Sequence, residues 1–258
     1  MTTRHRILAG LTTLLLLTTT ACSSPPDSKP SISAELQTEL PAAGDGLSRV
    51  LFFGDSIAEG LALPLSFAFD ASRVEFSSSA AAGGGTVVGE LSASTWTMLN
   101  DRLAHMKPST VIYQITTYDW GTQAELEAAY QRLLRATSAA HADLVFVTMP
   151  PIHPDDFYAP HMEDLTRTAD VARQVVDGSN GHAHLFDAHE VWGKTFNKDV
   201  DGKRFRSDDG IHTCPQGAAS FTKWLLEQLK GVYPSFSPAA PHAWANTGWA
   251  SDKHFIGC

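Results

Sequence analysis

The chain has 258 residues, of which 43% are hydrophobic and 18% are charged. That composition provides enough apolar residues for a sizeable core and excludes a chain that is disordered throughout. The formal net charge of -9 argues against a nucleic-acid-binding protein, because such proteins present a clustered basic face. The length suits one α/β domain with additional segments at its ends.

The first 46 residues are predicted to lie outside the folded domain. A short basic region from Arg4 to Arg6 precedes an apolar stretch rich in leucine and threonine, which is too short for a good membrane-spanning helix. We therefore interpret residues 1–21 as a signal peptide. Residues 22–46 are rich in Ser, Pro and Ala, and we interpret them as a tether.

The end of the apolar stretch reads Thr19-Thr20-Ala21-Cys22. It resembles a bacterial lipoprotein signal, in which the cysteine is diacylated and becomes the mature N-terminus. It departs from that pattern at Thr19, where leucine is usual, and the alternative is an ordinary secretory signal with an incidental cysteine. Both interpretations predict an extracytoplasmic protein. Lipidation of Cys22 further predicts an anchor in the cell membrane.

Export also bears on the two remaining cysteines, Cys214 and Cys258. An oxidising compartment favours a disulfide between them, and the alternative is two free thiols. The bridge would close a loop of about 45 residues and contribute about 4 kcal/mol in the chain-entropy model. We expect it to link a C-terminal tail, residues 232–258, to a domain that spans residues 47–231.

Within that domain, strand-like segments alternate with segments of helical period. This alternation predicts an α/β fold, with a parallel sheet that carries helices on both sides. Parallel strands that are covered on both faces read as near-continuous apolar runs. Five such runs predict strands at Arg49–Phe53, Arg73–Ser77, Thr110–Ile115, Leu144–Thr148 and His184–Phe186.

Two of the predicted helices have end signals in the sequence. Thr122 and Glu125 form a capping-box pattern, which predicts the start of a helix. Pro215 suits the first turn of the last helix, and Gly231 suits its C-terminal cap. The apolar faces of the two helices are formed by Leu126, Tyr130, Leu133 and Thr137, and by Ala218, Phe221, Leu225 and Leu229.

The first predicted strand ends on Gly54-Asp55-Ser56. Open parallel sheets bind ligands at the carboxyl ends of their strands, which makes Ser56 a candidate nucleophile. A serine hydroxyl needs a general base, and the base needs an orienting group. Asp209 and His212 lie three residues apart just before the last helix and could fill these roles. The alternative for that segment is a solvated acidic loop with an incidental histidine.

Gly54-Asp55-Ser56 and Asp209-Gly210-Ile211-His212 together resemble the SGNH (GDSL) hydrolase family, over roughly residues 49–230. The resemblance implies a three-layer α/β/α sandwich whose five-stranded parallel sheet has the order 2-1-3-4-5. It also implies that Ser56 is the nucleophile, that His212 is the general base and then acid, and that Asp209 orients His212. It implies no metal and no organic cofactor.

The family also has an oxyanion hole, whose donors stabilise the negatively charged intermediate. The resemblance assigns one donor to the backbone N–H of Ser56 and a second to Gly84, with Gly85 as the near alternative and a merely flexible glycine loop as the other reading. The third family donor is the asparagine of Gly-x-Asn-Asp, which Tyr118 replaces here. We expect Tyr118 to line the site, either as a displaced donor or as part of the acyl pocket.

Three further features of the sequence each have two alternative interpretations. His153 and Tyr158 lie in a loop that would overhang the site and are predicted to contribute to the substrate pocket, but a rigid surface turn explains them nearly as well. The histidines of HAHLFDAHE could bind a metal, but polar residues at the ends of a strand are the preferred interpretation, and we expect no metal. Trp244 and Trp249 of the tail would either contact substrate or pack the tail onto the domain.

These patterns predict an exported serine esterase that cleaves O-acyl esters through an acyl-enzyme on Ser56. The compartment favours acylated glycans or lipids of the cell envelope as substrates. The expected partners are that substrate and, through the lipid anchor, the membrane. We expect a monomer that binds no nucleic acid. The alternatives are an O-acyltransferase that uses the same triad, and a non-catalytic glycan- or lipid-binding lipoprotein on this scaffold, which the tyrosine at position 118 motivates.

Overall fold

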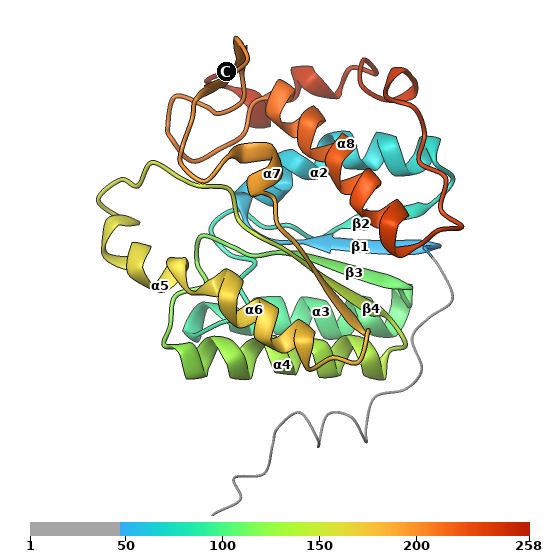
Figure 1. The fold of residues 1–258 in the computed structure, drawn as a ribbon, viewed down its shortest axis with the longest axis vertical. Coiled ribbons are helices and arrows are strands. Elements are labelled where there is room, and N and C mark those ends of the chain that lie inside the picture. Colours follow the sequence, from blue (N-terminus) through green and yellow to red (C-terminus); the bar gives the residue numbers. More distant parts are fainter. Residues whose placement is uncertain (1–46) are drawn as a thin grey trace, which may run out of the picture. The chain divides into compact units, whose positions relative to one another are not determined.

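The computed structural model describes residues 47–258, so the predicted signal peptide, Cys22 and the tether lie outside the described residues. Its centre is a five-stranded parallel sheet of order β2-β1-β3-β4-β5, which confirms the predicted order (Figure 1). The five strands are β1 (Arg49–Phe53), β2 (Glu75–Ser78), β3 (Thr110–Gln114), β4 (Asp143–Val147) and β5 (Ala183–Phe186).

Each of these strands begins within two residues of its predicted start. The largest difference is in β2, which begins at Glu75 and not at Arg73. Arg73 has a φ of 59°, in the left-handed region, and its N–H donates to the carbonyl of Asp70. The residue therefore belongs to the turn that follows the preceding helix.

Strand β1 shows why the strands read as continuous apolar runs. Val50 and Phe52 point into one hydrophobic cluster, and Leu51 and Phe53 point into a second cluster on the opposite face of the sheet. All four side chains are fully buried. Successive side chains of a strand point to opposite faces, so helices must cover both faces of this sheet.

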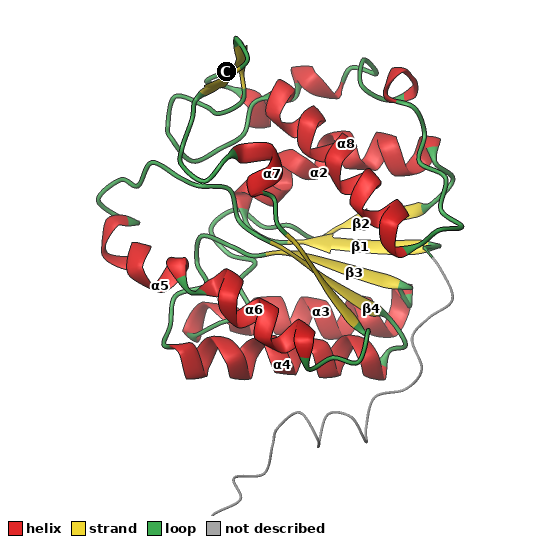
Figure 2. Ribbon diagram, in the orientation of Figure 1, coloured by secondary structure: helices red, strands yellow, loops and turns green. Residues whose placement is uncertain are grey.

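Helices do cover both faces and give the predicted three layers (Figures 1 and 2). One layer contains α2 (Ser56–Ala71) and α8 (Pro215–Val232). The other contains α3 (Ala93–Met106), α4 (Gln123–Ala139) and α6 (Thr168–Asp177). The shorter elements are α5 (Met162–Thr166), α7 (His189–Trp192) and an antiparallel pair of two-residue strands, β6 (Asp199–Val200) and β7 (Lys203–Arg204).

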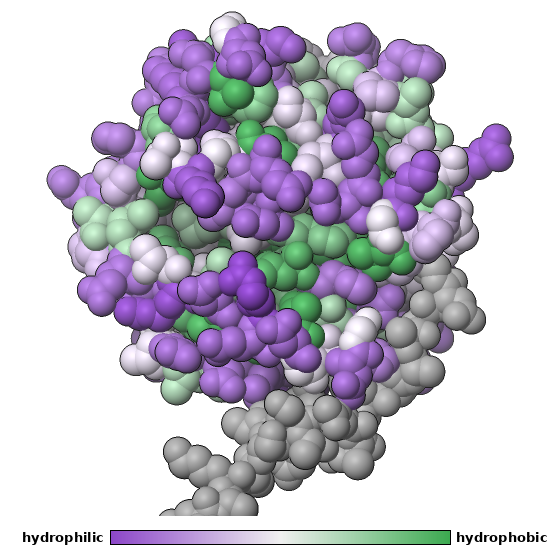
Figure 3. All heavy atoms as spheres, in the orientation of Figure 1, coloured by the Kyte–Doolittle hydropathy of each residue, from purple (hydrophilic) through white to green (hydrophobic). Residues whose placement is uncertain are grey.

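No helix between residues 47 and 258 is both long and apolar enough to cross a membrane. Figure 3 shows hydrophobic side chains in a band across the middle of one face, with hydrophilic side chains around it. Strand β5 forms one edge of the sheet, and His184 and Leu185 in its middle are only half-buried. This edge is therefore covered less completely than the central strands.

The helix-end signals were right at three positions and wrong at one. Thr122 and Glu125 form the capping box of α4, and α8 begins at Pro215, as predicted. Gly231 does not cap α8, because the helix continues to Val232 and Tyr233 is its C-cap residue. Tyr233 is buried, and its hydroxyl lies 3.1 Å from Thr110 Oγ1, so its packing carries the helix past the glycine.

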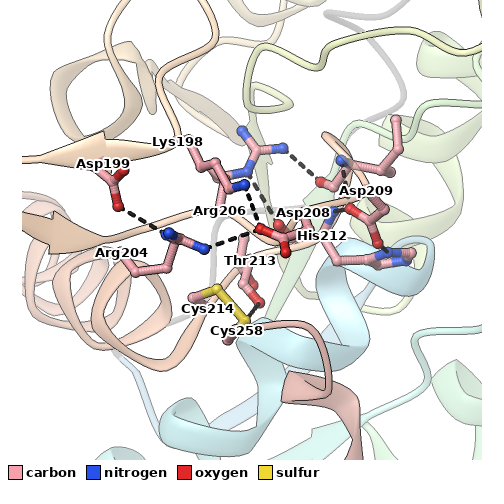
Figure 4. Close-up of a disulfide and its surroundings, with 11 residues drawn as sticks. Lys198, Asp199, Arg204, Arg206, Asp208, Asp209, His212, Thr213, Cys214 and Cys258 are labelled. Atoms are coloured by element: carbon pink, nitrogen blue, oxygen red, sulfur yellow. Dashed lines mark hydrogen bonds and ion pairs between the residues drawn. A yellow bond between two sulfur atoms is a disulfide. The ribbon is translucent and has the colours of Figure 1, made fainter.

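The tail is attached to the domain by hydrophobic packing and by a disulfide bond. Trp244 and Trp249 are 1% and 5% exposed and belong to the same cluster as α2 and α8. They therefore pack the tail onto the domain, which is one of the two alternatives that the sequence left open for them. The predicted disulfide between Cys214 and Cys258 is present (Figure 4).

Candidate active site

The turn between β1 and α2 places Ser56 at the carboxyl edge of the sheet. Asp55 is the N-cap of α2, and its Oδ1 accepts a hydrogen bond from the Ile57 N–H at 3.0 Å. Its other oxygen accepts from the N–H and the hydroxyl of Thr117 at 2.7 and 2.9 Å. Burial raises the pKa of Asp55, and these hydrogen bonds oppose the increase. Asp55 thus ties the turn that carries Ser56 to the loop after β3.

The structure brings the three residues of the predicted triad into one hydrogen-bonded series. Ser56 Oγ lies 2.8 Å from His212 Nε2, and His212 Nδ1 lies 2.7 Å from Asp209 Oδ2. In a neutral ring protonated at Nδ1, that N–H donates to Asp209 and Nε2 accepts from the serine hydroxyl. This arrangement suits a nucleophile, a general base and the group that orients the base.

The Asp209 carboxylate also fixes the backbone of its own loop. Its Oδ1 accepts hydrogen bonds from the N–H groups of Ile211 and His212 at 2.8 and 2.9 Å. Burial raises the pKa of Asp209, but the hydrogen bonds from His212 and Ile211 outweigh it, and the net shift is downward. Asp209 therefore remains ionised and can stabilise a protonated His212.

Arg206 supports the same loop through hydrogen bonds to its backbone, a role that the sequence did not predict. Its side chain is 1% exposed and donates hydrogen bonds to the carbonyls of Pro151, Ile211 and His212. Burial lowers the pKa of Arg206 to about 10, so it remains protonated at neutral pH. Figure 4 shows Arg206 next to the loop that carries Asp209 and His212. An arginine in the polar stretch RSDDG gives no local signal of burial.

Gly210 makes the tight turn between Asp209 and His212. Its φ is 77°, and a Cβ at this position would lie 2.9 Å from the Cβ and the carbonyl oxygen of His153. The His153 N–H donates to the Gly210 carbonyl at 2.9 Å. His153 therefore contacts the catalytic loop through its backbone, and its exposed ring is 6.0 Å from that of Phe196.

The N–H of Gly84, the predicted oxyanion-hole donor, donates to the Ala81 carbonyl at 3.1 Å and is therefore already engaged. Gly85, the alternative, has a φ of 80° and packs so closely that a Cβ would lie 1.9 Å from the Gly54 oxygen. Neither the Gly85 N–H nor the Ser56 N–H has an acceptor within residues 47–258. Both N–H groups are therefore free to donate a hydrogen bond.

A buried carboxylate, Asp119, anchors the glycine loop. It is fully buried, and burial raises its pKa, while hydrogen bonds from four surrounding hydroxyls oppose the increase. One of those hydroxyls belongs to Thr86, the residue next to Gly85. Asp119 thus fixes the loop that carries Gly85. The four hydroxyls are those of Thr86, Tyr113, Thr116 and Tyr130.

Tyr118 forms a contact that the sequence did not predict. Its hydroxyl lies 3.2 Å from that of Tyr158, and its ring lies 5.5 Å from the ring of Trp120. Burial and then the contact with Tyr158 raise the pKa of Tyr118, so the phenol is neutral. Tyr158 itself is 7% exposed. The two tyrosines form part of an aromatic cluster that also contains Trp120 and Phe157.

Ser56 and His212 line a pocket of about 380 Å³. Tyr118, His153 and Tyr158 were predicted to line the site, and within the described part of the chain they are not among the residues of this pocket. Tyr118 and Tyr158 contact each other, and His153 contacts Gly210 and Phe196. The pocket is lined instead by α2, by Ala82 and Thr213, and by three tail residues, Lys253, His254 and Ile256.

The histidine-rich segment near β5 has ordinary polar contacts. His189 Nδ1 lies 2.8 Å from Asp187 Oδ1, and Glu190 accepts a hydrogen bond from the Trp224 indole N–H at 2.7 Å. Burial lowers the pKa of His184. Over residues 47–258, no group of three or more His, Cys, Asp or Glu side chains is placed to hold a metal ion.

Solved structures with this fold include several esterases and lipases. One is a protein from Bacteroides fragilis described as an acylhydrolase, with 14% identity, a TM-score of 0.54, and coverage of 81% of this chain and 99% of that one. Another is a GDSL-like lipase from Bacteroides thetaiotaomicron, with 11% identity, a TM-score of 0.56, and coverage of 78% and 98%. A third is an acetyl xylan esterase variant from Geobacillus stearothermophilus, with 17% identity, a TM-score of 0.50, and coverage of 76% and 97%.

The chain matches no protein-family model and no curated protein. At these sequence identities, the similarity to solved structures establishes the fold. The strand order and the three layers are those of the SGNH (GDSL) hydrolases, as the two sequence motifs predicted. The chain therefore has an SGNH hydrolase fold.

Proposed function

We propose that this protein is a serine esterase of SGNH type, which hydrolyses O-acyl esters. The observation that carries the proposal is the hydrogen-bonded series from Ser56 through His212 to Asp209 at the edge of a pocket. The solved acylhydrolase, lipase and esterase structures with the same fold support it. The neutral hydroxyl, the ring nitrogen and the carboxylate provide what acyl transfer to serine needs.

In the first half of the reaction, Ser56 Oγ attacks the ester carbonyl while its proton passes to His212 Nε2. Asp209 stabilises the imidazolium that forms, because its carboxylate accepts from Nδ1–H. The N–H groups of Ser56 and Gly85 donate to the oxyanion of the tetrahedral intermediate. When the intermediate collapses, His212 returns the proton to the departing alkoxide. The alcohol leaves and the acyl group remains on Ser56.

The second half of the reaction uses the same groups with water as the nucleophile. His212 takes a proton from water, and the resulting hydroxide attacks the acyl-enzyme carbonyl. Collapse of the second intermediate expels Ser56 Oγ, which recovers the proton from His212, and the carboxylic acid is released. The chain's own residues supply each proton acceptor and donor in this sequence.

The test is hydrolysis of p-nitrophenyl esters from acetate to octanoate by wild type and Ser56→Ala. We expect the variant to lose at least about a thousandfold in kcat. Ser235→Ala is the matched control, because Ser235 is exposed on the turn after α8, and it should behave as wild type. No turnover by the wild type would overturn hydrolysis. Labelling of Ser56 by an organophosphonate would then indicate acyl transfer, and no labelling would indicate a binding protein.

We further propose that the protein is exported and anchored to the cell membrane through a lipid on Cys22, with acylated glycans or lipids of the envelope as substrates. The N-terminal sequence pattern supports this location, and so does the Cys214–Cys258 disulfide, a bond typical of oxidising compartments. The test is metabolic labelling with an alkyne fatty acid in a bacterial host. Wild type should carry the label and Cys22→Ser should not, while equal labelling would contradict the anchor.

A further inference from the structure

The pocket beside Ser56 has two walls of different origin. One wall is the first turn and a half of α2, with Ser56, Glu59 and Gly60. The other wall belongs to the tail, with Lys253, His254 and Ile256. The tail wall lies about 200 residues along the chain from the nucleophile, so only the folded tail brings it to the site.

The tail segment Asp252–Cys258 is fastened to both catalytic elements. On the α2 side, Phe255 is buried, and a Cβ added at Gly60 would lie 3.8 Å from its ring. On the His212 side, the Asp208 N–H donates to the Gly257 carbonyl at 3.3 Å, and Cys258 is bonded to Cys214. The wall is thus held in a fixed place relative to Ser56 and His212.

A histidine of the tail, His254, strengthens the contact between the tail and α2. His254 Nδ1 lies 2.6 Å from Asp252 Oδ1, and His254 Nε2 lies 3.8 Å from Glu59 Oε2. The ring therefore lies between a carboxylate of the tail and a carboxylate of the nucleophile helix. Lys253 is exposed and forms no ion pair within the described range, so its ammonium is available to a ligand.

The two walls offer a ligand three kinds of contact. The Lys253 ammonium can donate hydrogen bonds, and the Glu59 carboxylate can accept them. Ile256 is 80% exposed and adds an apolar surface next to these charged groups. A sugar ring combines hydroxyls, which both donate and accept, with apolar C–H faces. Polar groups placed around apolar surface are what give a small-molecule pocket its specificity.

We infer that the tail segment Asp252–Cys258 forms a subsite for a hydroxyl-rich, sugar-like alcohol half of the ester. This inference rests on the proposed esterase function and narrows its substrate class. The subsite binds the alcohol before and during attack by Ser56. Its loss therefore raises KM more than it lowers kcat, as expected when an interaction is equally strong in the ground and transition states.

The test compares two acetate esters with similar rings. One is a pool of mono-O-acetylated methyl glucosides, and the other is cyclohexyl acetate, which has no hydroxyls. Wild type should show the higher kcat/KM on the glucoside esters. The double variant Lys253→Ala/Ile256→Ala should lose about tenfold of that preference, mainly through KM, because contacts to charged donors are of this size. Acetate release is measured in a pH-stat with the full exported chain.

Lys230→Ala is the matched control, because Lys230 is exposed in the last turn of α8 and does not line the pocket. It should keep the wild-type preference. An unchanged preference in the double variant would overturn the inference, and so would a wild type without any preference. Hydrolysis of p-nitrophenyl acetate by wild type keeps these outcomes distinct from failure of the esterase itself. The single variant Ile256→Ser, at an exposed position, provides the same comparison if the double variant does not fold.

Discussion

The two ends of the Ser56–His212 hydrogen bond are held in place by different means. Ser56 lies where β1 passes into α2, and regular secondary structure and the buried Asp55 fix it. His212 lies in a loop between β7 and α8, and side chains and a disulfide fix it. The nucleophile is thus positioned by the end of a strand and the start of a helix, and the base is positioned by side chains and a disulfide that hold a loop.

The loop that carries His212 is also tied to distant parts of the chain. Arg206 reaches Pro151, which is 55 residues away, and Cys214 is bonded to a residue 44 positions later. Such long-range ties order a loop that has no helix or strand of its own. The comparison predicts that damage to the histidine end lowers both stability and catalysis, while the nucleophile end tolerates more.

The largest expected effect is loss of the orienting carboxylate at the histidine end. Asp209→Asn should lower kcat by about a thousandfold, because the amide no longer favours the ring tautomer that is protonated at Nδ1. The measurement is p-nitrophenyl acetate turnover. Asp208→Asn is the matched control, since Asp208 is exposed and pairs with Lys198 and Arg204. Equal losses in the two variants would mean that Asp209 has no special role.

Removal of the disulfide should have the next largest effect. Cys214→Ser/Cys258→Ser should lower the free energy of unfolding by about 4 kcal/mol, because the bond restricts the unfolded chain over a long loop. Urea denaturation measures the change. Cys22→Ser, outside the described domain, should leave the value as in wild type. A loss below about 1 kcal/mol in the double variant would show that the packing of Trp244 and Trp249 alone holds the tail.

The substitution Arg206→Met tests a second support of the histidine end. It removes the donor to three backbone carbonyls, two of them in the catalytic loop, and should cost about 3 kcal/mol of stability. It should also lower kcat, because the loop that carries His212 loses its support. Arg204→Met, two residues earlier and at a half-buried position whose ion pairs lie at the surface, should change the stability by no more than about 0.5 kcal/mol. Wild-type stability and kcat in the Arg206→Met variant would show that Arg206 does not support the loop that carries His212.

At the nucleophile end, Asp55→Asn should have a smaller effect. Asparagine caps a helix about as well as aspartate, so only the hydrogen bonds to Thr117 are weakened. We expect a loss of about 1 kcal/mol in the free energy of unfolding. Asp70→Asn, an exposed change near the end of the same helix, controls for the altered net charge. A loss larger than that of Arg206→Met would reverse the proposed difference between the two ends.

The smallest effect concerns pH. The pKa of Asp209 is lower in the folded protein than its unfolded value of about 3.9. Its contribution to stability is therefore fully present above the unfolded pKa and is lost as pH falls through the folded pKa. The difference in unfolding free energy between wild type and Asp209→Asn should shrink as pH is lowered below about 4. If this difference in unfolding free energy grew on acidification, it would contradict a lowered pKa of Asp209.

Features that depend on local sequence were predictable. The strands follow from short apolar runs, and the start of α4 follows from a capping box. Ser56 follows from its place at the end of the first strand. The pairing of Cys214 with Cys258 was also predictable, because the expected lipidation of Cys22 would leave only these two cysteines to pair.

Features that depend on close contacts were not predictable. Gly84 and Gly85 are adjacent and identical in type, and only the turn to Ala81 shows which N–H is already occupied. Nothing in the sequence indicates that Arg206 is buried. The sequence gives no local signal that Lys253, His254 and Ile256 line the pocket, because only the folded tail brings them to Ser56.

The disulfide also has a practical consequence for how this protein is prepared. The bond fastens the tail wall of the pocket to a position two residues after His212. A chain produced in a reducing cytoplasm lacks that bond until it is oxidised. Its preparations would then mix molecules with a fixed wall and molecules with a detached one. Substrate preferences should accordingly be compared only between samples whose thiols have been titrated.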